Sequence, residues 1–317
     1  MNLIDAYRYL AALEQHRHFG RAAAACHITQ PALSNALRSL EEHLGIAIVR
    51  RGRQYEGLTP EGERVLATAN RVLHEQELLA QELASGSGGA KGRLVIGTVP
   101  TAVPIASRFA ARLVELHPGL QPQVRSLASQ DIENGLDGLS IDLGLGYTDR
   151  LSALRGDRIR PWPQYVEHYH LLQRAEPAGA GLRFGAPVAW ADAAKLPLAL
   201  LTPEMHNRVI LDDVFHRLDL AVKPAIETNS VLALLVAVQA GGVAAVLPGA
   251  LVDTLSGQGH LEARPLVSPA LRTPIGFMTA RAVRPSRALQ AALALAEDAA
   301  WLSLAAKHTG PLAAVDH

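Results

Sequence analysis

Residues 20–43 of the chain read GRAAAACHITQPALSNALRSLEEH. We expect a short alanine-rich helix to end near Cys26. Thr29 is expected to cap a second helix, because its hydroxyl can accept a hydrogen bond from an unpaired backbone N–H. Pro31 falls in the first turn of that helix, where the missing proline N–H costs nothing. Apolar residues recur at spacings of three and four, at positions 32, 33, 36, 37 and 40, so the pattern predicts a helix-turn-helix.

The opposite face of the second predicted helix carries side chains of the types that hydrogen-bond base edges and phosphates. Residues 17–53 hold six arginines and two glutamates, a local net charge of +4, and three of the arginines follow the second helix as a wing over DNA would require. The predicted DNA contacts are Arg21, Thr29, Gln30, Pro31, Ser34, Asn35, Arg38, Arg50, Arg51 and Arg53. A three-helix bundle with an incidental arginine run is the alternative that this pattern leaves open.

The composition of the whole chain limits its class. The 317 residues include 30 Lys and Arg and 30 Asp and Glu, so a uniformly basic nucleic-acid coat is excluded. Hydrophobic residues make up 49%, enough for packed cores, and the length suits about two or three domains. Cys26 is the only cysteine, which excludes an intramolecular disulfide. A single thiol and an N-terminus without a signal-peptide pattern predict a cytoplasmic protein.

A Gly/Ser-rich run at 85–89, SGSGG, predicts a linker. The residues before it predict helices at about 2–16, 20–26, 30–43 and 60–84, with a hairpin at about 46–59. After it, short apolar strands alternate with helical patterns, which predicts an α/β region with a mostly parallel sheet. The expected strands lie at 93–98, 121–127, 141–145, 165–173, 198–202, 223–227, 243–247 and 274–280, and one helix is expected at 287–304.

These patterns predict four parts of the chain. They are a winged helix-turn-helix at 1–60, a linker helix and hinge at 61–90, an α/β region at 91–305, and a tail at 306–317. Two subdomains are expected within the α/β region, subdomain I at about 91–162 and 270–305 and subdomain II at about 163–269.

The predicted helix at 60–84 has an apolar seam formed by Leu66, Ala69, Leu73, Ala80 and Leu83. A neighbouring stripe repeats every seven residues, at Val65, Val72 and Leu79. Such a stripe predicts a partner helix, although Gln76 would weaken the seam. Packing of this helix against its own domain is the alternative.

The most apolar stretch of the chain, VLALLVAVQAGGVAAVLPGALV at 231–252, is interpreted as soluble structure and not as a membrane span. Its helical run ends at the glycine pair 241–242, and a short β-branched run at 243–247 follows. Gln239, the two glycines and Pro248 would all be costly in lipid.

Several motifs stand at spacings that resemble the signature of LysR-type transcriptional regulators. They are FGRAA at 19–23, TQPALS at 29–34, LE at 40–41, LG at 44–45, Arg50, and LTPEG at 58–62. The chain length, the long helix and the two expected α/β subdomains resemble that family as well. The chain departs from the usual pattern at 26–28, at Val49 and at Asn35, and Asn35 bears on base preference.

This resemblance implies the functional organisation of the chain. A winged helix-turn-helix would bind double-stranded promoter DNA, and linker helices would pair antiparallel in a homodimer, commonly assembled into a homotetramer. The α/β region would be an effector-binding domain with the fold of periplasmic binding proteins. A dimer would place two recognition helices in successive major grooves, about 10 bp apart.

Polar residues follow the predicted strands of the α/β region, where helix N-termini offer unpaired N–H groups to a ligand. We therefore expect a small-molecule effector between the subdomains. The predicted contacts are Thr98, Pro100, Thr101, Ser129, Gln130, Tyr147, Thr202, His206 and Asn229. Each Ser, Thr or Asn among them can instead be a helix cap. His206 and Arg208 are the charged candidates for an anionic effector, unless both face solvent.

The motifs of catalysis and cofactor binding are incomplete, so we expect a regulator without a cofactor and not an enzyme. The GLG at 144–146 lacks the third glycine and the helix of a dinucleotide site. His168 and His170 would share a strand face and could bind a metal, but a third ligand is missing and a solvated strand face is preferred. A disulfide-based peroxide sensor, as found in some LysR-type regulators, is excluded because no cysteine follows Cys26. The alternative function is a solute-binding or enzymatic α/β domain with an N-terminal helical appendage.

Overall fold

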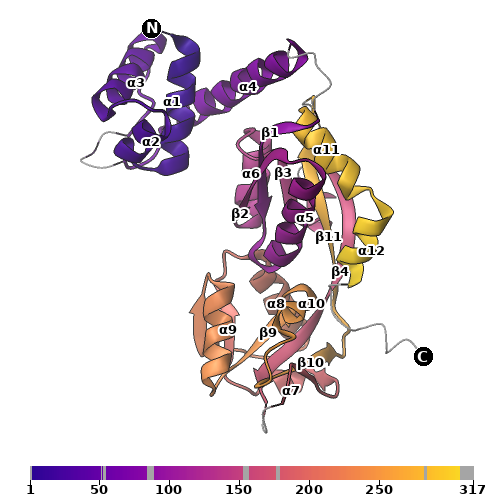
Figure 1. Cartoon of the computed structure of the whole chain (residues 1–317). Helices are drawn as coiled ribbons and strands as arrows, with labels where there is room; N and C mark the ends of the chain where they lie inside the picture. Colours follow the sequence, from indigo (N-terminus) through magenta and orange to yellow (C-terminus); the bar gives the residue numbers. More distant parts are fainter. Residues whose placement is uncertain are drawn as a thin grey trace. The chain divides into compact units, whose positions relative to one another are not determined.

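The computed structural model of the chain describes residues 2–50, 52, 55–83, 89–152, 157–175, 179–281 and 284–307. The chain divides into two compact units (Figure 1). Unit 1 comprises Met1–Gly88 with Gly135–Ser140, and unit 2 comprises Gly89–Asn134 with Ile141–His317. None of the helices in the described part of the chain is long and apolar enough to cross a membrane.

The described residues of unit 1 form a helical domain with a short hairpin. Its helices are α1 (Leu3–His16), α2 (Phe19–Ala25), α3 (Gln30–Leu44) and α4 (Pro60–Leu83). Between α3 and α4, an antiparallel bridge joins Val49 to Leu58 and closes the hairpin. Leu10, Leu33 and Leu40 are fully buried in one core, because the spacings of three and four place these residues on one face of each helix.

The first half of α4 packs against the core of unit 1. Ala69 is fully buried there, and Leu66 and Leu73 of the predicted seam pack partly buried against the same core. Leu79, further along α4, is 54% exposed. Packing against its own domain therefore accounts for the first half of the helix. The side chain of Leu83 lies outside the described part.

The strands of unit 2 form one mixed sheet. They are β1 (Lys91–Thr98), β2 (Gly119–Ser126), β3 (Leu143–Tyr147), β4 (Ile159–Arg174), β5 (Arg183–Phe184), β6 (Val188–Ala189), β7 (Leu198–Leu201), β8 (Ile226–Thr228), β9 (Ala244–Pro248), β10 (Leu261–Val267) and β11 (Arg272–Ala280). The order is β2-β1-β3-β11-β4-β9-β7-β8, and β10 pairs with β4, β5 and β6. The outer strands pair in parallel, whereas β4 and β11 run antiparallel to their neighbours.

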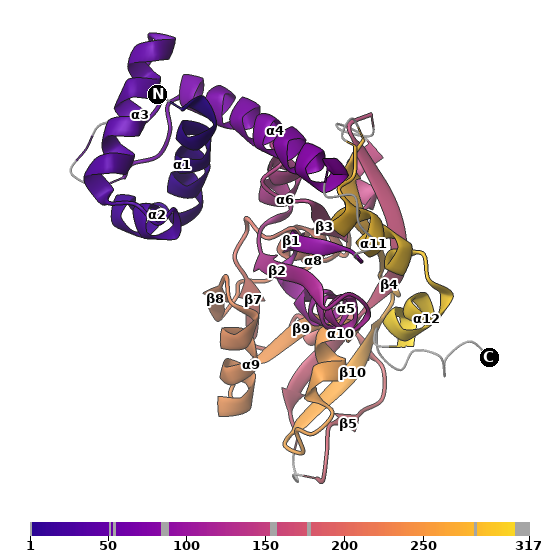
Figure 2. The ribbon, with the colours of Figure 1, turned by 45° about the horizontal axis from the view of Figure 1, so that its top comes forward.

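Helices cover both faces of this sheet. In chain order they are η1 (Pro100–Ala102), α5 (Val103–Leu116), α6 (Ser129–Asp137), η2 (Asp149–Ser152), α7 (Trp190–Ala193), α8 (His206–Arg217), α9 (Val231–Ala240), α10 (Gly249–Val252), η3 (Asp253–Leu255), α11 (Arg287–Ala296) and α12 (Ala299–Lys307). Figures 1 and 2 show α5 and α11 side by side, and residues of the two helices are in contact.

Strand β4 is the element that the two subdomains share. Its first half pairs with β11, which also pairs with β3, and its second half pairs with β9 and β10. In the second half, alternate residues enter different cores: Leu171 packs with residues of α7 and α8, and Leu172 packs with residues of α9 and α10. This alternation follows from the period of two of a strand that is covered on both faces.

Most of the predicted elements are confirmed, including the α9–glycine–β9 interpretation of 231–252. Some expectations are wrong. The strand expected at 165–173 begins at Ile159, the strand expected at 223–227 is β8 at Ile226–Thr228, and β5, β6 and β10 were not expected. The helix expected at 287–304 is two helices, because the Asp298 carboxylate accepts a hydrogen bond from Trp301 N at 2.9 Å and so begins α12.

The core of subdomain I predicts the cost of removing one ring. Phe109 of α5 is fully buried, with its ring centroid 4.3 Å from Phe277 and 4.9 Å from Trp301. We expect Phe109→Ala to lower the free energy of unfolding by about 3–5 kcal/mol. Urea denaturation measures the effect, with the exposed Val114→Ala on the same helix as the control. Equal losses in the two variants would show that Phe109 is not a core residue.

Candidate functional site

The structure forms the predicted helix-turn-helix from α2 and α3. Thr29 begins α3 and accepts a hydrogen bond from Ala32 N at 3.4 Å. Pro31 occupies the first turn, as expected. Gly45 ends α3 in the left-handed conformation, with φ 67°, which glycine adopts without a steric penalty. The second helix therefore has defined ends.

The two faces of α3 differ as the sequence predicts. Leu33, Leu37 and Leu40 are buried, whereas Gln30, Pro31, Asn35 and Arg38 are exposed and Ser34 is half-buried. An exposed polar face on a helix whose other face is fixed in a core is what entry into the major groove requires.

A carboxylate of α3 holds the hairpin in place. Glu41 Oε1 accepts hydrogen bonds from Ile48 N at 2.7 Å and from Val49 N at 3.0 Å. Gly62, in the first turn of α4, lies so close to Ile48 that an added Cβ would be 2.2 Å from the Ile48 carbonyl oxygen. Only glycine allows this approach, so α3, the hairpin and α4 form one rigid arrangement.

The predicted arginine contacts have different environments. Arg21 is exposed, and its guanidinium donates to His16 O at 3.0 Å. Arg50 Nε donates to Leu58 O at 2.9 Å, so Arg50 also stabilises the hairpin. Arg51 and Arg53 lie outside the described residues.

In unit 2, the nine predicted effector residues follow the carboxyl ends of several strands. Only some of them meet. Thr101 Oγ1 and Tyr147 Oη are hydrogen-bonded at 3.0 Å, and the ring of His206 lies 4.9 Å from the Tyr147 ring. Thr101 belongs to subdomain I and His206 to subdomain II, so Tyr147 joins the two subdomains.

Among the described residues, the structure gives the other predicted effector residues no side-chain hydrogen bond to Thr101, Tyr147 or His206. Thr98 and Ser129 are buried, and the Ser129 hydroxyl has no hydrogen-bond partner among the described residues. Thr202 donates to Glu204 Oε1 at 2.7 Å. Three remain: Pro100 is half-buried, Gln130 is exposed and donates to Asn134, and Asn229 is exposed.

Residues that the sequence did not single out complete the cluster around Tyr147. Asn207 Nδ2 donates to Tyr147 Oη at 3.5 Å. Tyr147 of β3 and Tyr165 of β4 both pair with Ile275 of β11, and Glu167 and Tyr169 follow Tyr165 on the same face of β4. A lone acid between two tyrosines in the run YVEHY is the sequence signal that would have found Glu167.

Glu167 is fully buried in this cluster. Its Oε1 accepts a hydrogen bond from Tyr165 Oη at 3.4 Å, and its Oε2 has no partner in the described part of the chain. Burial raises the pKa of Glu167 to about 8, against a smaller lowering by the Tyr165 hydrogen bond. The carboxyl group is therefore mostly neutral at pH 7.

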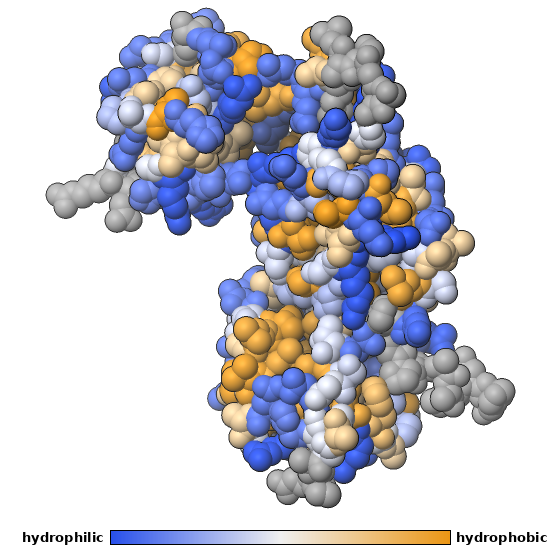
Figure 3. Space-filling view, viewed as in Figure 1, coloured by the Kyte–Doolittle hydropathy of each residue, from blue (hydrophilic) through white to orange (hydrophobic). Residues whose placement is uncertain are grey.

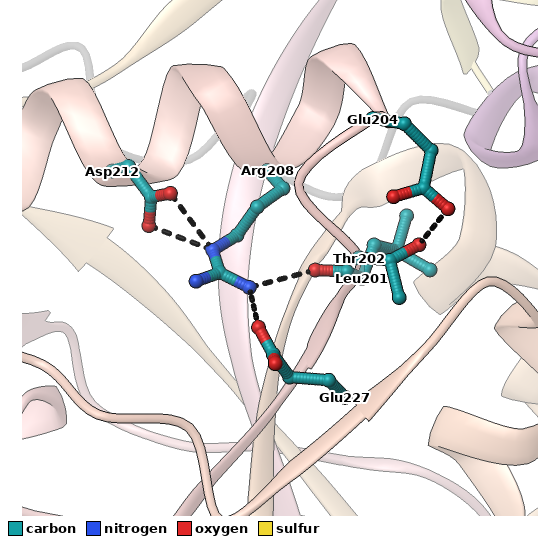
Figure 4. Close-up of polar contacts among 6 residues, drawn as sticks. All are labelled: Leu201, Thr202, Glu204, Arg208, Asp212 and Glu227. Atoms are coloured by element: carbon teal, nitrogen blue, oxygen red, sulfur yellow. Dashed lines mark hydrogen bonds and ion pairs between the residues drawn. The ribbon is translucent and has the colours of Figure 1, made fainter.

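Arg208, one of the two charged candidates for anion recognition, is already paired with carboxylates (Figure 4). Arg208 is buried, and it donates to both carboxylate oxygens of Asp212, to Glu227 Oε1 at 2.6 Å and to Leu201 O. Burial and the nearby Arg150 lower the pKa of His206, which favours its neutral form. These contacts give no support to the predicted anionic effector.

The solvated strand face predicted for His168 and His170 is wrong for His170, which is fully buried. Both ring nitrogens of His170 lack a hydrogen-bond partner among the described residues, and burial lowers its pKa to about 4. The described residues contain no group of three potential metal ligands.

Family comparisons match nearly the whole chain. The family described as "Bacterial regulatory helix-turn-helix protein, lysR family" matches residues 4–63, and "LysR substrate binding domain" matches residues 87–301.

Curated relatives match part of the chain. A probable hydrogen peroxide-inducible genes activator of Streptomyces viridosporus is 38% identical over 137 residues, which is 43% of this chain and 44% of that protein. The DNA-binding transcriptional dual regulator OxyR of Escherichia coli is 35% identical over 144 residues, 45% of this chain and 47% of that protein. The matched part thus spans about half the length of these relatives.

Solved structures support the fold over nearly the whole chain. A full-length OxyR from Pseudomonas aeruginosa, in which a cysteine is replaced by aspartate, has a TM-score of 0.68 at 23% identity and covers 91% of this chain and 95% of that chain. CbnR in complex with its target DNA has a TM-score of 0.62 at 18% identity and covers 96% and 99%.

The raised pKa of Glu167 predicts a dependence of stability on pH. In the unfolded chain this carboxyl ionises near pH 4.5, whereas in the folded chain it keeps its proton to about pH 8. The folded state therefore loses stability as the pH rises through this window. We expect Glu167→Gln to gain about 3 kcal/mol on the wild type between pH 5 and pH 8.

Urea denaturation at the two pH values measures this gain. Glu115→Gln, an exposed change on α5, serves as the control and should follow the wild type. A constant difference between Glu167→Gln and the wild type would mean that Glu167 is ionised in the folded protein.

Proposed function

The chain belongs to the LysR family of transcriptional regulators, and from this premise we propose that it binds promoter DNA under the control of a small molecule. The molecule would bind between the two subdomains of unit 2 and alter promoter binding or bending. The observation that carries the DNA-binding part is α3, whose exposed face presents Gln30, Asn35 and Arg38 beside a hairpin held by Glu41.

The chemistry of the α3 face supports separate roles for its residues. Gln30 and Asn35 carry amide groups that can pair with adenine in the major groove, and Arg38 can pair with guanine or a phosphate. Arg21, Thr29, Pro31, Ser34 and Arg50 would orient the domain on the backbone, together with Arg51 and Arg53 outside the described residues. Asn35, where many family members have Arg or Gln, would change the preferred base.

The arrangement of unit 2 supports control by a bound molecule. Thr101 of subdomain I and Asn207 of subdomain II both reach the hydroxyl of Tyr147. A ligand bound there would contact both subdomains and so favour one relative position of the two. It can act on DNA binding only if it binds one state of the protein more tightly than another.

A bound molecule is also the better proposal because unit 2 has no thiol. Two matched relatives are described as a probable hydrogen peroxide-inducible genes activator and as OxyR, and the solved OxyR from Pseudomonas aeruginosa carries a substituted cysteine. The only cysteine of this chain is Cys26, in the helix-turn-helix, and burial raises the pKa of its thiol. We therefore propose sensing without thiol oxidation.

Self-association has two candidate surfaces. Leu79 and Ala80 in the second half of α4 are exposed, as a pairing linker helix would require. Helix α9 contains no charged residue, and Leu232 and Val236 are 69% and 54% exposed. Figure 3 shows hydrophobic surface where α9 lies. We propose that α4 forms the dimer and that α9 joins dimers into a tetramer. In a two-fold symmetric contact the same patch of both copies is buried, so an exposed apolar helix can be covered by its own copy.

We propose that the protein acts on promoter DNA in the cytoplasm. The alternative of a solute-binding or enzymatic domain with a helical appendage is not favoured, because the lysR helix-turn-helix family matches residues 4–63.

Removal of the Arg38 guanidinium tests the DNA-binding surface. A contact of arginine to base or phosphate contributes about 1–3 kcal/mol, so Arg38→Ala should weaken binding about tenfold or more. Fluorescence anisotropy would measure this on a duplex selected by the wild-type protein from a random pool. Arg112→Ala, on α5 of unit 2, is the matched control. If Arg38→Ala binds the selected duplex as tightly as the control, α3 is not the recognition helix.

Charged substitutions test the two self-association surfaces. Leu79→Glu should convert the assembly to monomers or to dimers joined by α9 alone, and Leu232→Glu should stop assembly at a dimer. Sedimentation velocity measures the mass of each species, with Val209→Glu, another exposed apolar position, as the control. Unchanged mass in both variants would exclude α4 and α9 as interfaces.

A further inference from the structure

Glu167 lies where the two subdomains share a strand. It is on β4 and pairs with Thr273 of β11, and its side chain is fully buried. Nearly all buried polar atoms in proteins have a hydrogen-bond partner. Oε2 of Glu167 has no hydrogen-bond partner in the described part of the chain, so it becomes an unfilled acceptor whenever the carboxyl group is ionised.

Three buried tyrosines lie near this carboxyl group. They are Tyr147, Tyr165 and Tyr169, and negative charge on Glu167 would raise the pKa of each of them. Tyr147 is hydrogen-bonded to Thr101, and Tyr169 Oη is hydrogen-bonded to Thr273 Oγ1 at 3.0 Å. Their hydroxyls are therefore partly occupied within the cluster, whereas the faces of tyrosine rings attract cations.

Positive charge near the cluster is already balanced. Arg208 pairs with Asp212 and Glu227, and Arg150 Nε pairs with Glu133 at 2.8 Å. An anionic ligand would meet a buried carboxyl group here, and Arg150 and Arg208 already have carboxylate partners. A ligand with a cationic donor would instead complete the hydrogen bonds of Glu167 and balance its charge.

Two side-chain contacts join the subdomains. Tyr147 Oη links Thr101 to Asn207, and Arg108 of α5 pairs with Asp253 of η3 at 2.8 Å. The Tyr147–Asn207 and Arg108–Asp253 contacts each join subdomain I to subdomain II. Their separation would open the cluster to a small molecule without breaking the pairing of β4 with β11.

Resting on the function proposed above, we propose that the molecule bound between the subdomains carries a protonated amino group. The ammonium group would donate a hydrogen bond to Oε2 of Glu167 and lie among Tyr147, Tyr165 and Tyr169. Since Glu167 is mostly neutral in the free protein, binding would release its proton to the solvent, and the ligand would replace that proton as the balancing charge.

Matched sets of small ligands test this proposal with the full-length protein. Each set holds an amine, an alcohol and a carboxylate on the same carbon skeleton: propylamine, propanol and propionate; 1,4-diaminobutane, 1,4-butanediol and succinate; benzylamine, benzyl alcohol and benzoate. Thermal shifts at up to about 20 mM ligand rank the compounds. Calorimetry in phosphate and in Tris buffer then counts the protons released.

We expect the amine of at least one set to raise the Tm above its matched alcohol and carboxylate, with about one proton released at pH 7. Glu167→Gln should bind that amine at least tenfold more weakly. Glu167→Asp, which keeps the charge, should recover part of the affinity. The control Glu115→Gln should bind as the wild type does.

Three results would overturn the proposal: a larger shift by alcohols or carboxylates, equal binding of the amine by Glu167→Gln, or no shift by any amine. Binding of the random-pool duplex, measured in parallel, separates this failure from that of the proposed function. If a carboxylate changes the affinity for the duplex, the proposed regulatory function stands and only the amine ligand is excluded. If the wild-type protein selects no duplex, the proposed regulatory function itself is excluded.

Discussion

The pairing of β4 with β11 is the constraint on which the rest of unit 2 depends. From Ile159 to His168, β4 is hydrogen-bonded to β11, and from Tyr169 to Arg174 it is bonded to β9 and β10. One continuous strand therefore belongs to both subdomains. Because strand pairing fixes which side chains share a face, the register of β4 brings Tyr165, Glu167 and Tyr169 to the same face of the sheet.

This register has an energetic consequence. A carboxyl group at position 167 cannot turn to solvent without a shift of the whole strand, so its burial is maintained by the many hydrogen bonds of β4. The cost appears as a raised pKa and a carboxyl oxygen without a hydrogen-bond partner among the described residues. A cost of this kind is common at functional sites, where the surrounding structure holds a group in an environment that it would otherwise avoid.

The sequence predicts unit 1 better than the site in unit 2, and the reason is the range of the interactions. Thr29, Pro31 and Gly45 act within one or two turns of α3, so local patterns predict the helix and its exposed face. The cluster around Tyr147 takes residues from η1, β3, β4 and α8, which lie up to about a hundred positions apart. Local patterns identified Thr101, Tyr147 and His206, each next to a strand end. They missed Glu167 because it lies in the middle of a strand.

The same difference in range explains why charged residues next to a strand end were a poor guide to ligand chemistry. A charge acts through its partners, and Arg208 illustrates this: Asp212 is four residues away on its helix, but Glu227 comes from β8 and is brought close only by folding. The arginine that seemed available to an anion is therefore already neutralised. Glu167 is the converse case, since the described part of the fold provides it with no cation. The ligand preference of unit 2 follows from which buried ionisable group lacks a partner of opposite charge, and in the cluster around Tyr147 that group is an acid.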